Sequence, residues 1–113
     1  MDFTVTQENR TSIIQVNVER LNASNASGLK AELSLLSKSS INNIVIDLSK
    51  TKYCDSSGLS ALLLANRLCK DTNGMFVLCG LQDNVKKLIS IAQLDKVLNI
   101  AENKEAAISQ IAQ

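Results

Sequence analysis

Histidine is absent from this chain of 113 residues, and that absence excludes several kinds of site. Without it there is no triad with a histidine base, no imidazole metal ligand and no imidazole pH switch. Tryptophan is also absent, and aromatic residues make up only 3%. Such a chain has little with which to stack on bases or line a flat cofactor pocket. We therefore expect no cofactor, no bound metal and an aliphatic interior.

An excess of one charge is lacking as well, because 12 Lys and Arg face 11 Asp and Glu, for a net charge of +1. Nothing here supplies the positive field that binds phosphate backbones or anionic lipid. The longest apolar stretch, Ala61 to Ala65, is far below the ~20 residues that span a bilayer. Residues 1–10 lack the basic start and apolar run of a secretory signal. We expect a cytoplasmic protein that binds no nucleic acid and inserts into no membrane.

The cysteines are few and irregularly spaced. Cys54, Cys69 and Cys79 are an odd number with no C-x-x-C pair, a pattern that favours neither a disulfide framework nor a zinc site. We expect free thiols that are mostly buried. Cys54 has two interpretations, a reactive thiolate or a small hydrophobic residue, and the second is the commoner state of a free cysteine.

Strand and helix patterns alternate along a chain whose length suits one domain over residues 1–113. Period-two alternation predicts strands, and apolar residues three and four apart predict helices. The predicted elements are a hairpin over 3–18, a helix over 26–37, a strand over 44–48, a helix from Ser56 or Ser57 to 69, a strand over 75–79, a helix from Asp83 or Asn84 to 92, an edge strand over 97–100 and a helix over 103–112. The fold class is α/β in the order ββαβαβαβα, with a mixed sheet of four to five strands, an N-terminal β-hairpin and about four helices.

Right-handed crossovers between parallel neighbours place the ends of several strands at one edge of this sheet. The strands that end near Arg20, Leu48 and Cys79 should share that edge. Ligands and modifications of open α/β sheets usually lie beyond the carboxyl ends of the strands. A site should therefore draw on residues 20–25, 49–58 and 80–83.

One segment carries a specific motif. An apolar strand, Ile44-Val45-Ile46-Asp47-Leu48-Ser49, leads to the turn Asp55-Ser56-Ser57-Gly58-Leu59. This arrangement resembles the STAS domain of bacterial anti-sigma factor antagonists, in which a strand ending in Asp-Leu precedes a D-S-[ST]-G-[LV] turn that opens a helix. In that family the serine or threonine before the glycine is phosphorylated, which corresponds to Ser57. The predicted element order matches the family over essentially the whole chain.

The resemblance implies a regulator of transcription that works by partner switching and is not an enzyme. The unphosphorylated domain would bind an anti-sigma factor with serine kinase activity, phosphorylation on Ser57 would end the complex, and a serine phosphatase would restore it. We expect a monomer or weak dimer. The residues we expect at the partner are Asn22, Ser24, Asp55, Ser56, Gly58, Leu59, Ser60 and Leu63. Many family members carry Gly-x-Leu-Asp where this chain has Glu19-Arg20-Leu21-Asn22. Asn22 keeps helix-capping chemistry but lacks the negative charge.

Elementary electrostatics agrees with a phosphorylated Ser57. A phosphoryl group at a helix N-terminus meets unpaired N–H groups and the positive end of the macrodipole, for ~0.3–1 kcal/mol. Its charge of about −1.5 to −2 would disturb a docked partner more than its own domain. Asp55 could position the Ser57 hydroxyl or act as the cap of the first turn. The plainer interpretation is structural: Ser56 and Ser57 are only N-caps, Asp55 is a dipole partner and Gly58 is a packing residue.

Two other functions can be written for the same residues. An accessory subunit of a lipid-transport ATP-binding-cassette complex would grip its ATPase with the same helix and would need no phosphorylation. An enzyme would use Ser57, Cys54 or Asp55 as its nucleophile. With no histidine, Lys52 is the one nearby candidate base, and no group orients it. We therefore expect no enzyme activity.

Overall fold

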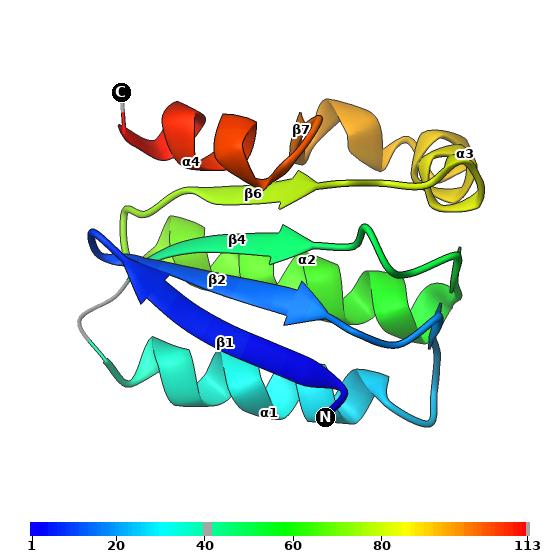
Figure 1. Cartoon of the computed structure of the whole chain (residues 1–113), viewed down its shortest axis with the longest axis horizontal. Helices are drawn as coiled ribbons and strands as arrows, with labels where there is room; N and C mark the ends of the chain where they lie inside the picture. Colours follow the sequence, from blue (N-terminus) through cyan, green and yellow to red (C-terminus); the bar gives the residue numbers. More distant parts are fainter. Residues whose placement is uncertain (40–41, 113) are drawn as a thin grey trace.

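The chain turns back on itself near its start through two adjacent residues with positive φ. The computed structural model describes residues 1–39 and 42–112, and its first strands are β1 (Phe3–Glu8) and β2 (Thr11–Val16), paired antiparallel. Between them Asn9 has φ 49° and Arg10 has φ 67°. Positive φ at both central residues gives a turn whose twist matches that of the flanking strands. The predicted hairpin is thereby confirmed (Figure 1).

Four of the five strands of the main sheet run parallel. The order is β1-β2-β4-β6-β7, with β4 at Asn43–Asp47, β6 at Phe76–Cys79 and β7 at Asn99–Ala101. Only β1 is antiparallel to its neighbour. The strands β2, β4 and β6 therefore end at one edge, as the crossover rule predicted. The α/β fold with its mixed sheet and N-terminal hairpin is confirmed.

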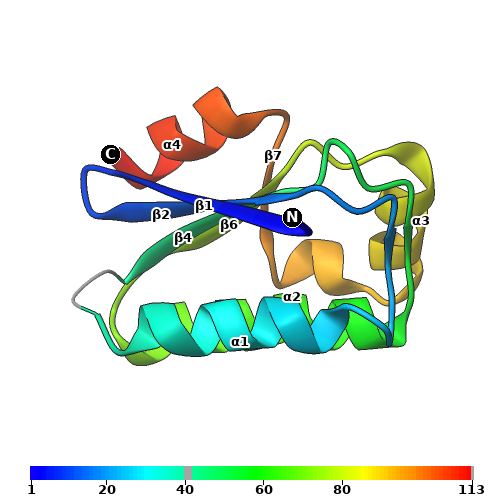
Figure 2. The same ribbon diagram turned by 60° about the horizontal axis from the view of Figure 1, so that its bottom comes forward.

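Helices cover the two faces of the sheet unequally (Figure 2). The helices α1 (Ala26–Ser37) and α2 (Ser56–Asp71) lie side by side on one face, and α4 (Lys104–Ala112) lies on the other. The helix α3 (Asp83–Ile91) and a 3-10 turn, Leu94–Lys96, follow at the end where β6 leaves the sheet. No helix in the described part of the chain is both long enough and apolar enough to cross a membrane.

Alternating side chains divide the core into two clusters. In β4, Ile44 and Ile46 join the large cluster beneath α1 and α2, whereas Val45 points the other way into the cluster beneath α4. Both sets are buried, since β4 is covered on both faces. A continuous apolar run is the sequence pattern of such a strand.

A second, very small sheet was not predicted. The two-residue strands β3 (Arg20–Leu21) and β5 (Tyr53–Cys54) pair in parallel, and the Arg20 guanidinium lies 4.4 Å from the centre of the Tyr53 ring. The segment before α2, expected to be loop throughout, is therefore partly strand. Two residues are too few to show an alternating pattern, so these strands carry no periodic signal that could predict them. The 3-10 turn was missed for the same reason.

Gly80 sits where β6 ends, at the shared edge of the strands. Its φ is +70°, and a Cβ there would lie 2.8 Å from Asp47 Oδ1 and 3.0 Å from the Ser49 Cβ. Asp47 is buried, and its Oδ1 accepts a hydrogen bond from the Ser49 N–H at 2.9 Å. A side chain at position 80 would therefore combine backbone strain with displacement of a buried carboxylate.

We expect Gly80→Ala to lower the free energy of unfolding by ~1–3 kcal/mol, as measured by chemical denaturation. Gly28→Ala in α1 is the matched control, because a Cβ there meets only the end of the Phe3 side chain, at 3.1 Å. The gain in helix propensity, up to ~1 kcal/mol, should offset that contact. Equal losses in the two variants would contradict the assignment of strain to Gly80.

Candidate functional site

Asp55 begins α2 as its N-cap. Its Oδ1 accepts hydrogen bonds from the Ser57 N–H at 2.9 Å and the Gly58 N–H at 3.1 Å. The prediction that Ser56 or Ser57 caps the helix is wrong, because both are helical residues in the first turn. The alternative role for Asp55, as the cap, is the one observed. A capping aspartate also places negative charge at the positive end of the helix dipole.

Gly58 holds the first turn of α2 against the small sheet. A Cβ at this position would lie 2.5 Å from Cys54 Sγ and 2.8 Å from the backbone oxygen of Leu21. The Asp55 N–H also donates to that Leu21 oxygen, at 3.2 Å. Gly58 is buried, which differs from its expected place at a partner surface. Its absent side chain allows close packing, so it contributes to the position of Ser57 and not to a contact area.

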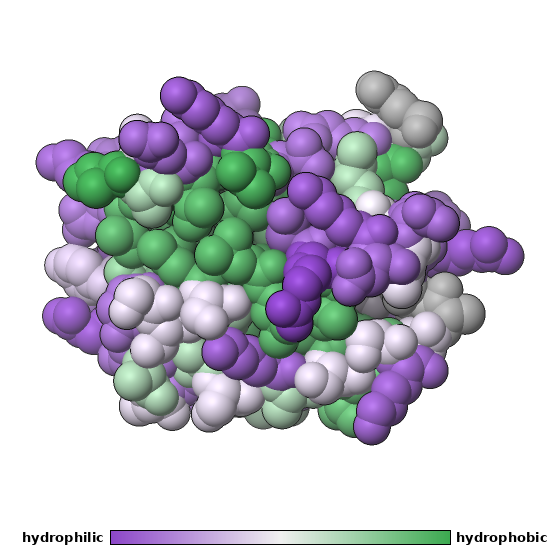
Figure 3. Space-filling view, turned by 180° about the vertical axis from the view of Figure 1, so that it is seen from behind, coloured by the Kyte–Doolittle hydropathy of each residue, from purple (hydrophilic) through white to green (hydrophobic). Residues whose placement is uncertain are grey.

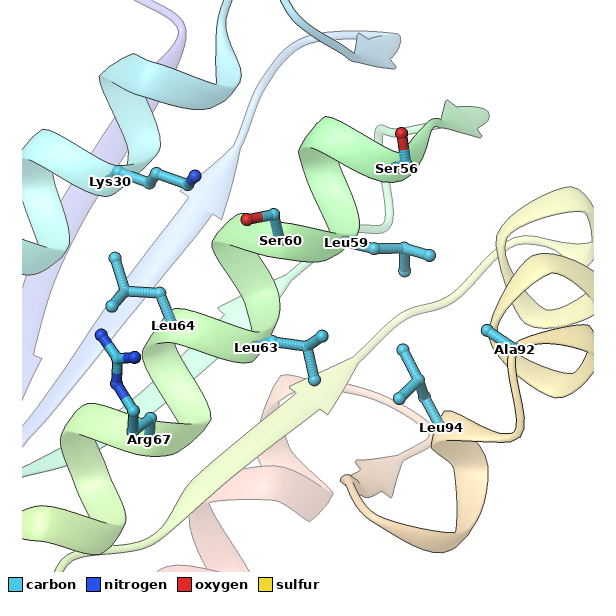
Figure 4. Close-up of a pocket in the computed structure, with 9 residues that line it drawn as sticks. All are labelled: Lys30, Ser56, Leu59, Ser60, Leu63, Leu64, Arg67, Ala92 and Leu94. Carbon is cyan, nitrogen blue, oxygen red and sulfur yellow. The ribbon is translucent and has the colours of Figure 1, made fainter.

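Ser57 lines a polar hollow of about 380 Å³ between the N-terminal halves of α1 and α2. The residue is partly exposed, so its hydroxyl can be reached from solvent. The polar residues that share the hollow are Ser27, Lys30, Ser56 and Ser60. Lys30 extends from α1 toward α2, and the Ser60 hydroxyl points back toward it (Figure 4). The candidate site is therefore a serine-rich cleft with one cation.

The environment of Ser57 differs in one respect from the electrostatic expectation. The Asp55 carboxylate already accepts from the N–H groups of Ser57 and Gly58, and the Leu59 N–H donates to the Asp55 carbonyl. A phosphoryl group on Ser57 would not find these donors free, and would carry its charge close to another anion. The helix dipole remains favourable to the phosphoryl group, but these N–H groups are already hydrogen-bonded to Asp55.

An apolar groove of about 640 Å³ runs along the outer face of α2 (Figures 3 and 4). Leu59 and Leu63 of α2 point toward Leu94 across it, and Lys30 and Arg67 are its charged lining residues. Leu63 is 37% exposed. The inner face of the same helix is buried by Ala61, Leu62, Ala65 and Cys69. The helix is therefore buried on its inner face and carries apolar side chains on its outer face.

Asn22 closes a turn before α1. Its Oδ1 accepts from the Ser24 N–H at 3.0 Å and the Ser24 hydroxyl at 2.6 Å, and its own N–H donates to Asn25 Oδ1 at 2.9 Å. The N-cap position of α1 belongs to Asn25, so the predicted capping role of Asn22 is wrong. Asn22 and Asp55 line one small hollow of about 220 Å³. The pairing of β3 with β5 thus brings them together, while Ser24 lies exposed beside them.

Cys54 does not have the properties of a reactive thiolate. Burial, with a smaller contribution from the nearby Asp55 carboxylate, raises the pKa of its thiol to about 11. The thiol is therefore protonated at neutral pH, and its sulfur packs beside Gly58. The interpretation as a small packing residue fits these facts. Cys69 and Cys79 are buried free cysteines, with pKa values raised by burial to about 11 and 12.

Leu64 and Arg67 of α2 line the groove but were absent from the predicted site, and the same is true of two residues outside that helix, Ala92 and Leu94. These last two come from the end of α3 and the 3-10 turn, which no sequence motif connects to α2. Lys30 was missed as well. A helical register alone would have placed Lys30 one turn after Ala26 and Ser27, but only the packing of α1 on α2 puts it beside Ser57.

Comparisons with known proteins identify the family and the fold of the chain. A Bordetella bronchiseptica protein, BtrV, whose name places it among the anti-sigma factor antagonists, is 31% identical over 87 residues, which cover 77% of this chain and 75% of that protein. A Thermotoga maritima structure with a name of the same type superposes with a TM-score of 0.92 at 21% identity, over 98% of this chain and 95% of that one. The phosphorylated form of SpoIIAA, described as a Bacillus cell fate determinant, gives a TM-score of 0.75 at 20% identity, over 96% and 98%. The STAS domain model matches residues 2–107, and the chain belongs to the STAS domain family.

Proposed function

We propose that the protein is an anti-sigma factor antagonist whose binding is switched off by phosphorylation of Ser57. The observation that carries this proposal is the place of Ser57, partly exposed in the first turn of α2 and next to an apolar groove. The name of BtrV supports the class of partner, and the existence of a phosphorylated SpoIIAA supports the kind of modification. The partner is then an anti-sigma factor with serine kinase activity.

The switching step is a phosphoryl transfer. The Ser57 Oγ attacks the γ-phosphorus of ATP, ADP leaves, and the hydroxyl proton is lost. The product carries about −1.5 to −2 charge where a neutral hydroxyl stood. A serine phosphatase reverses the change when water attacks the phosphorus and the Ser57 hydroxyl leaves. In both steps this domain is the substrate, and its partners supply the catalysis.

The surface for the partner runs from the turn at Asp55 along the outer face of α2. Leu59, Ser60 and Leu63 lie along it, with Leu63 at the exposed edge of the groove. Apolar contacts of this kind supply binding energy when a partner excludes water from them. A phosphoryl group on Ser57, at the Asp55 end of this surface, would lose its hydration when the partner docks, and that cost opposes binding.

We expect incubation with the cognate kinase and ATP to add one phosphate, which mass spectrometry of peptides locates on Ser57. Ser57→Ala should abolish the added mass with the fold intact. Ser57→Asp should weaken partner affinity while leaving the melting temperature nearly unchanged, because the residue is partly exposed. Phosphate on another residue would sink the proposal. No modification, together with stable co-purification with a transporter ATPase, would favour the lipid-transport reading.

We expect Leu63→Glu to reduce the affinity of the unphosphorylated protein for its anti-sigma factor at least tenfold, because a carboxylate would enter the apolar contact. Leu35→Glu is the matched control: Leu35 is 65% exposed on α1 and lines neither the hollow nor the groove. Binding is measured by isothermal titration calorimetry, and circular dichroism checks the fold. Equal loss of affinity in the two variants would show that the groove is not the contact surface.

A further inference from the structure

We propose that Lys30 receives the phosphoryl group of Ser57 inside the hollow between α1 and α2. This inference rests on the proposed phosphorylation of Ser57 and adds the residue that holds the modified side chain. Lys30 is partly exposed on α1 and lines the same hollow as Ser57. It also lines the apolar groove, so it stands where the two surfaces meet.

The polar side chains of this hollow have no partners of their own. In residues 1–39 and 42–112, the Lys30 ammonium makes no salt bridge or hydrogen bond, and neither do the hydroxyls of Ser27 and Ser60. Figure 4 shows the Lys30 side chain directed from α1 toward α2, with the Ser60 hydroxyl facing it. An ammonium offers three N–H donors, and phosphoryl oxygens accept strongly from charged donors. Among the described residues, the hollow thus offers the Lys30 ammonium and the two serine hydroxyls as free donors to a phosphoryl group on Ser57.

The Asp55 carboxylate is an anion close to Ser57, so a phosphoryl group on Ser57 is more favourable with a cation beside it. Asp55, two residues before, keeps its carboxylate on the N–H groups of Ser57 and Gly58. A phosphoryl group therefore meets an anion on its own helix and finds two backbone donors already occupied. Lys30 is the cation among the hollow's lining residues, and no acidic residue lines it. The favourable direction for the modified side chain is away from the Asp55 cap and toward α1.

This placement gives the modification a definite effect on the outer surface. A phosphoryl group held by Lys30 would fill the hollow beside Ser60. It would also fix the Lys30 side chain where the hollow meets the groove. The partner would then face an ordered ion pair in place of a single lysine and neutral hydroxyl groups, and desolvating that pair opposes docking. Phosphorylation would change the surface without moving the helix.

The test is a 31P NMR titration of protein in which genetic encoding installs phosphoserine at position 57, so that no kinase is needed. A nearby ammonium favours the dianion and lowers the second pKa of the phosphoserine. We expect Lys30→Met to raise that pKa by roughly half a pH unit. Lys30→Arg, which keeps the charge, should leave it near the parent value. Lys38→Met, which removes one positive charge from the exposed end of the same helix, is the control and should leave it unchanged.

Each outcome decides the assignment. A rise confined to Lys30→Met, with Asp55 present in every variant, supports a direct contact between Lys30 and the phosphoryl group. The same pKa in Lys30→Met and the parent would overturn the inference, and so would an equal rise in Lys38→Met, which would report net charge alone. Neither result touches the proposed function, which fails separately if no kinase modifies Ser57 or if modification leaves partner binding intact.

Discussion

The candidate site depends on one close approach, that of the first turn of α2 to the small sheet formed by β3 and β5. Cys54 Sγ and the Leu21 carbonyl lie so close to Gly58 that there is no room for a Cβ at this position. The Asp55 N–H donates to the same carbonyl. The Asp55 side chain then caps the helix from the other side. Together these contacts fix the backbone on either side of Ser57, so the serine has a defined position although its side chain remains accessible.

Parallel topology explains why residues far apart in the sequence meet at this point. The strands β2 and β4 are neighbours that run in the same direction, so the segments leaving them emerge together and pair again as β3 and β5. The two helices that follow, α1 and α2, consequently start at the same end of the molecule and lie side by side (Figure 1). Ser27 and Lys30 of the first helix face Ser57 and Ser60 of the second for this reason.

Much of this arrangement could be predicted from the sequence, and the failures have physical causes. Periodicity predicted the hairpin, the strands of the main sheet and the helices, but not β3 and β5, and the crossover rule predicted the edge where Asn22 and Asp55 meet. The choice of cap was wrong at Ser56 and Ser57 because the backbone conformation of Asp55, φ −110° and ψ −171°, decides which of several eligible residues stands outside the helix. Lys30, Ala92 and Leu94 could not be predicted because they reach the site through helix packing, for which no local pattern exists.

The same packing indicates how a single modification could act on binding alone. Beneath Ser57, the inner face of α2 is closed by Gly58, Ala61 and Leu62, all buried. A phosphoryl group cannot turn inward without displacing this core, whereas outward it meets a hollow that already holds a lysine and hydroxyl groups. The proposed modification would therefore place its charge on the side of the proposed partner surface, at little cost to the fold. The packed inner face of α2 thus leaves the hollow between α1 and α2 as the place where a phosphoryl group on Ser57 can be accommodated.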